Sequence, residues 1–510
     1  MNSQKEEPAP VIPFTKPLPS LAGRAALAML LMVGFYVLAV AIASGLLFIP
    51  YAEIAYAHRL HLKLTLLCLG GALAILWSVL PRIDRFELPG PELSRSLHPE
   101  LFSELQSVAK SVNQDMPAEV YLLADVNAWV AERGGVMGFG SRRVMGLGLP
   151  LMRVLTRSQF RAVLAHEFGH YHGGDTRLGP WIYKTRGAIG RTLQSLGDDS
   201  WLRVPFLWYG KMFLRITHAV SRRQEFVADR LAARAVGSQP LIAGLRTIHG
   251  VAPAFHSYLL QECAPLLSAG YRPPLAEGFQ RFVQAPPVAE AITRQLEEEL
   301  KTGKEDPYDT HPPLKERIAA VEHLPAGNPG AEDPPATVLL NDLPGLEHRL
   351  IGTLIEPGAA ENLEPIHWSE VVSSVFLPQW TELLRANTAA LGGLVPESLP
   401  ETAANPKAFG LRLRSPGGET PDDGDAEGLA GAVVGAALAV LLAQRGGMVS
   451  SVPGEPVSAS IGVTSIEPFG VLQSLADRKL SADVWQRQCS ELGILGADLG
   501  RVVPTPEAQS

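Results

Sequence analysis

A mainly α-helical protein with a small β-sheet, anchored in a membrane near its N-terminus, is the fold that this 510-residue sequence predicts. Two long uncharged runs lie near the N-terminus, and apolar residues at helical spacing dominate the chain after them. Strand-like segments are short, as at residues 120–123 and 142–149. At ~100–200 residues per domain, the length predicts two to four domains.

The composition excludes several classes of protein. The net charge is -8 and the pI about 5.9, whereas nucleic-acid-binding domains usually carry a basic excess, so no nucleic-acid partner is expected. The three cysteines, Cys68, Cys263 and Cys489, are far apart and odd in number. A disulfide scaffold is therefore excluded, and a cysteine-ligated zinc site is not expected.

Two transmembrane helices are expected within residues 25–81. After a polar, proline-rich tail over residues 1–24, residues 25–50 carry no charge and are long enough to span a bilayer core as a helix. A second uncharged run covers residues 64–81, and a short polar segment connects the two. The alternatives are a cleaved signal peptide for the first run and a buried core helix for the second.

Basic residues set the expected orientation of this hairpin. Three Lys or Arg residues precede the first run and three follow the second closely, whereas the connection has only Arg59 and Lys63. By the positive-inside rule, the N-terminus and everything after residue 81 face the cytoplasm. The expected localisation is the cell (inner) membrane, as a multi-pass protein with a cytoplasmic catalytic domain.

The middle of the chain contains a helix with a well-marked beginning. A helix and a strand are expected over residues 92–122, and a second strand over residues 142–149. Thr156 then follows as an N-cap candidate, and Gln159 three residues later completes a capping-box pattern. The glycine pair at 173–174 is expected to end the helix that begins there.

This helix contains the motif HEFGH over residues 166–170. Residues i and i+4 project from one face of a helix, so His166 and His170 can bind one metal ion. Glu167 lies one step round the helix, where it can accept a proton from a metal-bound water. These polar side chains would otherwise make a poor core, because unpaired buried polar groups cost several kcal/mol. A metal site is therefore expected.

A catalytic zinc ion needs three protein ligands and one open position. The candidates for the third ligand are His172, Asp175, Glu225 and His311. Glu225 is the best placed, because Asp229 follows one turn later on the same helix face and can accept a hydrogen bond from a ligand histidine. The alternative for this pair is a solvated helix face, on which both acids pair with neighbouring arginines.

Three segments together resemble the M48 metallopeptidases. They are HEFGHYHGGD at the metal motif, SRRQEFVAD over residues 221–229, and THPPLKERI over residues 310–318. The family includes membrane-bound HtpX-type proteases and CAAX prenyl-protein peptidases, and the similarity covers about residues 80–323. It implies a gluzincin metallopeptidase domain, which we expect over residues 82–323.

The resemblance also implies roles for single residues. It implies one zinc ion per chain, held by His166, His170 and Glu225, with Glu167 as the general base. In the family, the positions of Asn127 and His311 lie beside the zinc and help hold the substrate or the oxyanion.

Residues 142–149 match the family's edge strand, to which an extended substrate can add as another strand. On this basis Arg142, Val144 and Gly146 are expected to bind substrate.

Two departures from the family pattern stand out. HtpX-like members have further membrane spans between the HExxH motif and the glutamate, but here residues 176–220 are interrupted by charged side chains. Residues 207–220 are instead expected to form an amphipathic helix near the cleft or the membrane surface. The long membrane chamber of the CAAX peptidases is also missing, which weakens the case for a prenylated substrate.

The C-terminal third carries no catalytic motif. Trp368 and Trp380 are expected to anchor its core, and residues 428–443 to form a buried helix rather than a third membrane segment. The predicted divisions are a linker over residues 324–345, a helical accessory region over 346–414, an acidic linker over 415–427 and an α/β accessory domain over 428–510.

The preferred hypothesis is a membrane-anchored zinc endopeptidase that hydrolyses membrane or misfolded proteins with a metal-activated water. Protein or peptide substrates and the lipid bilayer are its expected partners. The alternatives are a non-catalytic membrane scaffold on a protease fold and a CAAX-type prenyl-protein peptidase. The presence of Glu167 and of a full ligand set argues against the scaffold.

Overall fold

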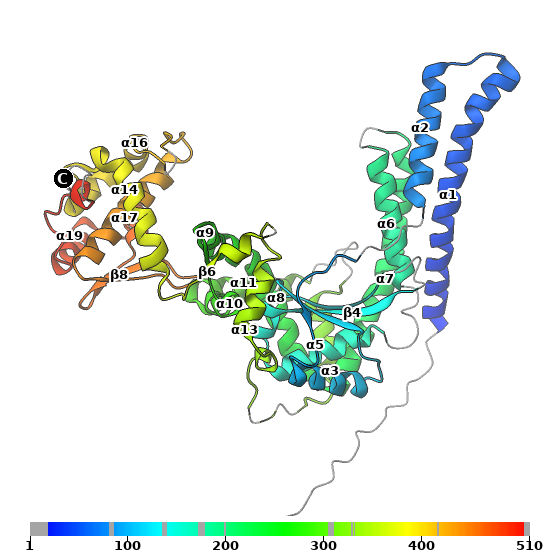
Figure 1. Cartoon of the computed structure of the whole chain (residues 1–510), viewed down its shortest axis with the longest axis horizontal. Helices are drawn as coiled ribbons and strands as arrows, with labels where there is room; N and C mark the ends of the chain where they lie inside the picture. The colour runs from blue at the N-terminus through cyan, green and yellow to red at the C-terminus, as the bar shows by residue number, and fades with distance from the viewer. Residues whose placement is uncertain are drawn as a thin grey trace, which may run out of the picture. The chain divides into compact units, whose positions relative to one another are not determined.

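The fold consists of two compact units that are mainly helical, with small sheets, as the sequence predicts (Figure 1). Unit 1 comprises Met1–Ala252 and Thr293–Leu354, and unit 2 comprises Pro253–Ile292 and Ile355–Ser510. The computed structural model describes residues 19–80, 86–134, 140–171, 179–197, 200–303, 311–327, 330, 332–356, 358–415 and 418–503.

Unit 1 begins with two long apolar helices, α1 (Pro19–Ala57) and α2 (Leu62–Val79), which pack against each other as a hairpin (Figure 1). Residues Ala26–Ala57 and Leu62–Val79 are long and apolar enough to cross a membrane. Large apolar side chains such as Leu30 and Trp77 remain 67% and 65% exposed, as expected for helices that face lipid. The predicted hairpin is therefore confirmed, and it supports a membrane localisation.

Two further helices, α6 (Gly179–Ser195) and α7 (Arg203–Ala235), pack alongside this hairpin (Figure 1). Phe35 of α1 is fully buried, with its ring 6.2 Å from the rings of both Phe206 and Tyr209 of α7. The amphipathic helix expected over residues 207–220 is thus the N-terminal half of a continuous 33-residue helix. That half joins the apolar helices, and the other half carries Glu225.

The sheet of unit 1 has four strands in the order β1-β2-β4-β3. Strand β4 is parallel to β2 on one side and antiparallel to β3 on the other. The strand bounds are β1 (Glu92–Leu93), β2 (Glu119–Leu123), β3 (Ala128–Arg133) and β4 (Arg142–Gly148).

The expectation that residues 142–149 form an edge strand is therefore wrong. Strand β3 lies outside β4, and Trp129 of β3 covers Gly146, where a Cβ atom would lie 2.5 Å from the indole ring. Because β4 has a partner on each side, its backbone has no free edge to offer a substrate. Among the described residues, β3 is the edge strand on this side of the sheet.

The metal-motif helix, α5 (Arg157–Gly169), begins as the sequence predicts. Thr156 and Gln159 form the full capping box, in which each side chain accepts from the other residue's backbone N–H. The helix ends at Gly169, with His170 as its C-cap, and the expected end at 173–174 lies outside the described residues. On its outer side, the buried carboxylate of Glu104 pairs with two arginines of its first turns, which fixes the helix against α3 (Pro99–Ser111).

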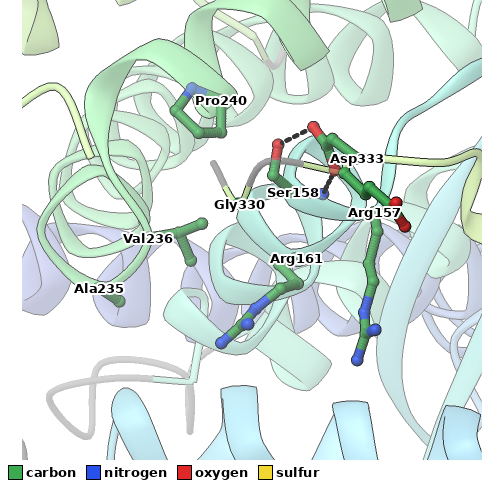
Figure 2. Close-up of a pocket in the computed structure, with 9 residues that line it drawn as sticks. Arg157, Ser158, Arg161, Ala235, Val236, Pro240, Gly330 and Asp333 are labelled. Carbon is green, nitrogen blue, oxygen red and sulfur yellow. Dashed lines mark hydrogen bonds between the residues drawn. The ribbon is translucent and has the colours of Figure 1, made fainter. Parts of the chain in front are cut away.

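The segment expected as a linker over residues 324–345 instead packs on the start of α5. Asp333 accepts hydrogen bonds from the backbone N–H and the hydroxyl of Ser158, at 2.8 and 2.6 Å, and Pro334 accepts one from the N–H of Arg157. Figure 2 shows the pocket of about 440 Å³ beside these contacts. Its charged lining is largely paired internally, since Arg157 and Arg161 are held by Glu104.

Three short helices and one 3₁₀ turn complete the core of unit 1. They are α4 (Leu149–Val154), α12 (Leu314–Val321), the 3₁₀ turn η3 (Ala336–Leu339) and α13 (Leu343–Ile351). The chain passes from one unit to the other within α8 (Ser238–Tyr258) and α11 (Pro286–Thr302).

Unit 2 forms around α17 (Ala426–Gln444), as the sequence predicts for a buried helix. Val433, Val434 and Leu438 are fully buried among side chains of α14 (Leu377–Leu391) and of the C-terminal helices. The two regions predicted over 346–414 and 428–510 therefore share one core. Its other helices include α15 (Leu399–Ala403), α16 (Pro406–Gly410), α18 (Val471–Ala476) and α19 (Ala482–Glu491).

Two small sheets and the predicted tryptophans complete unit 2. Trp368 is 5% exposed and donates from Nε1 to the carbonyl of Pro274, while Trp380 packs against Phe469. Residues 253–292, which the sequence assigns to the peptidase domain, belong to this unit. The remaining elements are α9 (Ala264–Ser268), β5 (Tyr271–Arg272), α10 (Leu275–Gln284), β6 (Glu364–Pro365), β7 (Met448–Ser450), β8 (Ser458–Ile461) and β9 (Thr464–Ile466).

Two glycines of α17 test whether it is a core helix. A Cβ atom at Gly435 would lie 2.5 Å from the Phe469 ring, whereas one at Gly428 would meet nothing within 4 Å. We expect Gly435→Leu to lower the free energy of unfolding of unit 2 by about 1–3 kcal/mol or more, and Gly428→Leu to leave it nearly unchanged. Denaturant titration of the full chain, followed by hydrogen exchange in unit 2, measures both. Equal tolerance of the two leucines would indicate a lipid-facing helix.

Candidate metal centre

A close crossing of α5 and α7 builds the centre. A Cβ atom at Gly169 would lie 3.0 Å from the Cα atom of Ala228 and 3.2 Å from its Cβ atom. Only a glycine facing a small residue permits this approach, because any larger pair would push the helices apart. The crossing brings Glu225 of α7 next to His166 and His170 of α5.

The ligand atoms of His166, His170 and Glu225 converge on one point. They all lie within 4.8 Å of one another. Nε2 of His166 is 3.4 Å from Oε2 of Glu225, and Nε2 of His170 is 3.5 Å from Oε1. Ligand atoms about 2.0–2.1 Å from a tetrahedral zinc lie roughly 3.4 Å apart, so the observed spacing fits such an ion.

The burial of Glu225 also fits a cation. Its side chain is 7% exposed, and its buried Oε2 atom has only long contacts, 3.4 Å each, with Nε2 of His166 and Nη2 of Arg317. A buried carboxylate oxygen is costly unless it is paired or binds a metal. Two imidazole nitrogens and one carboxylate oxygen are a donor set that zinc accepts.

Asp229 orients the first histidine. Its Oδ1 atom is 2.9 Å from Nδ1 of His166, and its side chain is fully buried. Because Nδ1–H donates to this carboxylate, Nε2, which is directed toward Glu225, is the ring nitrogen that can bind a metal once its proton is displaced. The alternative of a solvated helix face is wrong, because Glu225 and Asp229 are only 5% and 0% exposed.

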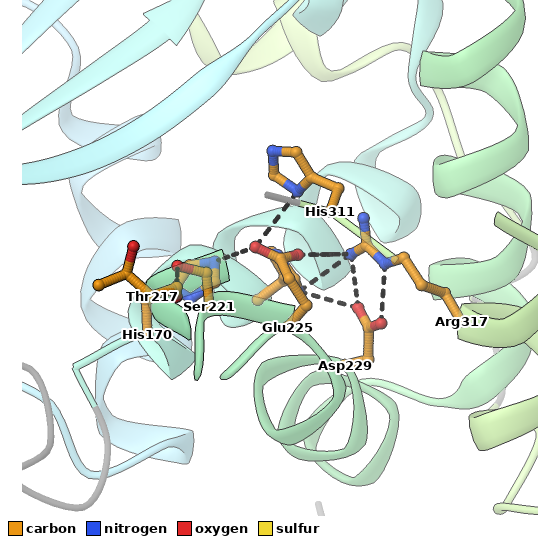
Figure 3. Close-up of polar contacts among 8 residues, drawn as sticks. His170, Thr217, Ser221, Glu225, Asp229, His311 and Arg317 are labelled. Carbon is orange, nitrogen blue, oxygen red and sulfur yellow. Dashed lines mark hydrogen bonds and ion pairs between the residues drawn. The ribbon is translucent and has the colours of Figure 1, made fainter. Parts of the chain in front are cut away.

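Arg317 of α12 completes the centre, and the sequence analysis gave it no role. Its guanidinium donates to both carboxylate oxygens of Asp229, from Nε at 2.9 Å and from Nη2 at 2.7 Å, and Nη2 is 3.4 Å from Oε2 of Glu225 (Figure 3). The signal was present in the sequence. Arg317 falls on the same helix stripe as Leu314, Ile318 and Val321, all buried, and an arginine on a buried stripe needs a buried partner.

The charges of this network depend on one another. Burial alone would raise the pKa of Glu225, but hydrogen bonds from His166 and His311 hold it well below its usual range. Burial likewise opposes the charge of Asp229, and the hydrogen bonds from Arg317 and His166 lower its pKa. Both carboxylates are therefore anionic at neutral pH, and together they favour a bound cation.

The remaining groups of the motif titrate differently. Burial lowers the pKa of His170 to about 4, and the nearby charge of His166 adds to this effect, so His170 is neutral as a ligand must be. Burial would lower the pKa of His166, but its hydrogen bonds with Asp229 and Glu225 outweigh it and raise that pKa to about 10, so a metal ion that binds Nε2 must displace a proton from this imidazole. Burial raises the pKa of the Glu167 carboxyl to about 7.

His311 lies at an accessible part of the centre, and Asn127 is exposed at the start of β3. The His311 side chain is 55% exposed, and its Nδ1 atom is 3.2 Å from Oε1 of Glu225. Asn127 is exposed and directly precedes β3, which packs beside α5. His311 therefore borders the proposed ligands, and Asn127 lies at the start of a strand that packs beside α5.

The residues expected to bind substrate on β4 have structural partners instead. Arg142 pairs with Glu119 at 2.7 Å, Val144 is fully buried, and Gly146 lies under Trp129. The ligand candidates His172 and Asp175 lie outside the described residues.

The pair of Arg317 and Asp229 can be tested by a double-mutant cycle. Removing one partner leaves the other charge buried, so we expect Arg317→Met and Asp229→Asn each to lower the free energy of unfolding of unit 1 by roughly 3–5 kcal/mol. The double variant should lose clearly less than the sum. Denaturant melts of the metal-stripped protein measure the cycle, and strict additivity would show that the two side chains do not interact.

The comparisons with known proteins agree with this geometry. The model of peptidase family M48 matches residues 96–324. A protease HtpX homolog of Archaeoglobus fulgidus is 26% identical over 235 residues, which cover 43% of this chain and 66% of that protein, just under two thirds. Protease HtpX of Pasteurella multocida is 25% identical over 241 residues, which cover 44% of this chain and 72% of that protein. No solved structure matches significantly.

The matched segment contains the whole centre, from the sheet and α5 to Glu225 of α7 and Arg317 of α12. The resemblance noted in the sequence is confirmed. Residues 96–324 of this chain match the model of peptidase family M48, and over about this length the chain is similar to two HtpX proteases.

Proposed function

We propose that the protein is a zinc-dependent endopeptidase of the membrane, with His166, His170 and Glu225 as the metal ligands. The observation that supports this most strongly is the convergence of these three side chains beside Glu167, in a domain of a metallopeptidase family. Zinc, when bound, would polarise a carbonyl group and lower the pKa of a water molecule. Asp229 and Arg317 would hold the ligands in place.

Glu167 acts as the general base in this proposal. Its carboxylate takes a proton from the attacking water and returns it to the leaving amine. A carboxyl group whose pKa is raised to about 7 by burial is suited to both steps near neutral pH.

His311 and Asn127 are proposed to act on the substrate. The Nδ1 atom of His311 is 3.2 Å from Oε1 of Glu225, and this side chain is 55% exposed beside the proposed ligands, which supports a role in stabilising the oxyanion. Asn127 would hold the substrate backbone where β3 begins. The extended substrate would add to β3, because β3 has the free edge that β4 lacks.

The location of the substrates follows from the membrane hairpin. We place the peptidase domain in the cytoplasm, from the basic residues that flank the two apolar runs. Both relatives reported above are named as proteases. We therefore propose membrane or misfolded proteins as the substrates.

Glu167→Gln tests the proposed chemistry. Because a general base contributes about 10²–10⁴-fold, the variant should cleave fluorescently labelled casein at least 100-fold more slowly than the wild type, with an unchanged zinc content. Glu297→Gln, the same substitution at an exposed position of α11, should cleave at the wild-type rate. Equal rates for the wild type and Glu167→Gln would refute the proposal and favour a non-catalytic scaffold.

A further inference from the structure

We propose that α6 and the first half of α7 form a half-depth membrane insertion. This α6–α7 wedge comprises Gly179–Ser195 and residues 201–217, and it would enter the bilayer from the side of the metal centre with its Trp201 end foremost, so that this end lies near the mid-plane. It lies entirely within unit 1. The proposal concerns lipid as the partner and does not depend on peptidase activity.

Two contacts with α2 set the depth of the wedge. Oγ1 of Thr192 is 2.7 Å from Oγ of Ser78, at the end of α2, and a methyl carbon of Leu202 would lie 3.2 Å from a Cβ atom at Gly71. Gly71 is halfway along the 18-residue helix. At 1.5 Å per residue, about 14 Å of α2 extends beyond that level. An 18-residue helix is about 27 Å long and nearly matches a bilayer core, so the wedge ends near its middle.

The outer face of the wedge is apolar. Trp201, Val204, Trp208 and Met212 recur at spacings of three and four residues and are 70%, 51%, 75% and 43% exposed. On the opposite face, Phe206 and Phe213 are fully buried against the hairpin. A helix with apolar side chains on both faces is typical of a membrane environment. Helices α1 and α2, against which the wedge packs, also expose large apolar side chains, which supports lipid as its partner.

Three polar side chains of the wedge have hydrogen-bond partners on its inner side. Nε of Arg191 donates to the carbonyl of Ser78, and Nη2 of Arg186 donates to the hydroxyl of Thr217. Thr192 pairs with Ser78, as described above, and both side chains are buried. Polar atoms that are satisfied by protein beneath an apolar outer face are arranged as a bilayer requires.

Exposed basic residues mark where the wedge would leave the hydrocarbon. Lys211 lies nine residues beyond Leu202, about 14 Å along the helix, which is close to half the bilayer core. An ammonium group at that depth reaches the lipid headgroups. Arg215 follows one turn later and is also exposed. Both charges therefore suit a wedge whose tip lies at the mid-plane.

The wedge also fixes the distance from the membrane to the metal centre. Glu225 lies 23 residues beyond Leu202 on the same helix, or about 35 Å. With the tip at the mid-plane, the centre lies about 20 Å outside a 30 Å core. This consequence rests on the proposed function: bonds cleaved in a membrane protein would lie at least about six extended residues beyond the bilayer.

Tryptophan quenching tests the depth of the wedge. The full chain is reconstituted in phosphatidylcholine vesicles whose acyl chains are brominated at carbons 6,7 or at carbons 11,12. The bromines at carbons 11,12 lie deeper in the bilayer than those at carbons 6,7. Trp201→Phe should remove the fluorescence that the deep bromines quench most strongly. Trp208→Phe should remove the fluorescence that the shallow bromines quench more strongly. Trp380→Phe, in unit 2, should leave lipid quenching unchanged. If Trp201 and Trp208 are quenched by aqueous iodide and by neither lipid, the wedge lies in water and the proposal is wrong.

Thiol labelling distinguishes a half-depth wedge from a full crossing. Arg59→Cys, in the connection between α1 and α2, marks the far side of the membrane in a chain whose native cysteines are replaced by alanine. Ser200→Cys, next to the tip, should resist an impermeant maleimide applied from the side that labels Arg59→Cys. Labelling of both positions from that side would overturn the proposal. Neither experiment uses catalysis, so loss of peptidase activity would not affect its outcome.

Discussion

The crossing of α5 over α7 is the constraint on which the rest of the structure depends. Gly169 and Ala228 let the two helices approach to van der Waals contact. That approach brings a carboxylate from one helix to two histidines on the other, although 55 residues separate Glu225 from His170. Because α7 continues from the apolar helices into the centre, the same helix carries the membrane contacts and the third proposed ligand.

The buried charges around this crossing are stable only as a group. Asp229 and Glu225 are two carboxylates in one poorly hydrated cluster, and neither would remain charged there alone. Arg317 offsets the charge of Asp229 with two hydrogen bonds. The imidazole of His166 contacts both carboxylates, Asp229 through Nδ1 and Glu225 through Nε2. The cluster therefore holds both carboxylates anionic close to where a divalent cation would bind.

Local sequence patterns predicted the parts of the structure that local forces determine. The capping box of Thr156 and Gln159, the spacing of His166 and His170, and the shared helix face of Glu225 and Asp229 all follow from helix geometry. The two uncharged runs predicted the membrane hairpin because bilayer thickness sets their length. These features needed no knowledge of distant contacts.

The features that the sequence did not predict depend on contacts between distant segments. The sequence of a single strand does not specify its neighbours in a sheet. The prediction that β4 is an edge strand is therefore wrong, because β3 pairs with its outer side. The proline-rich composition of residues 324–345 predicted a linker. Asp333 of this segment instead accepts two hydrogen bonds from Ser158 at the start of α5. Charged residues in α6 and α7 suggested a surface helix, but two of them, Arg186 and Arg191, donate hydrogen bonds within the helical bundle.

Zinc binding by the wild type and by Glu225→Ala, compared side by side, tests the account most directly. The detergent-solubilised wild type should bind about one zinc ion per chain, with the affinity of Glu225→Ala reduced by more than the roughly 10–100-fold typical for loss of a residue that only supports a ligand. Glu297→Ala, on an exposed helix face, should bind as the wild type does. Undiminished zinc affinity in Glu225→Ala would contradict the claim that the crossing of α5 and α7 assembles the metal site.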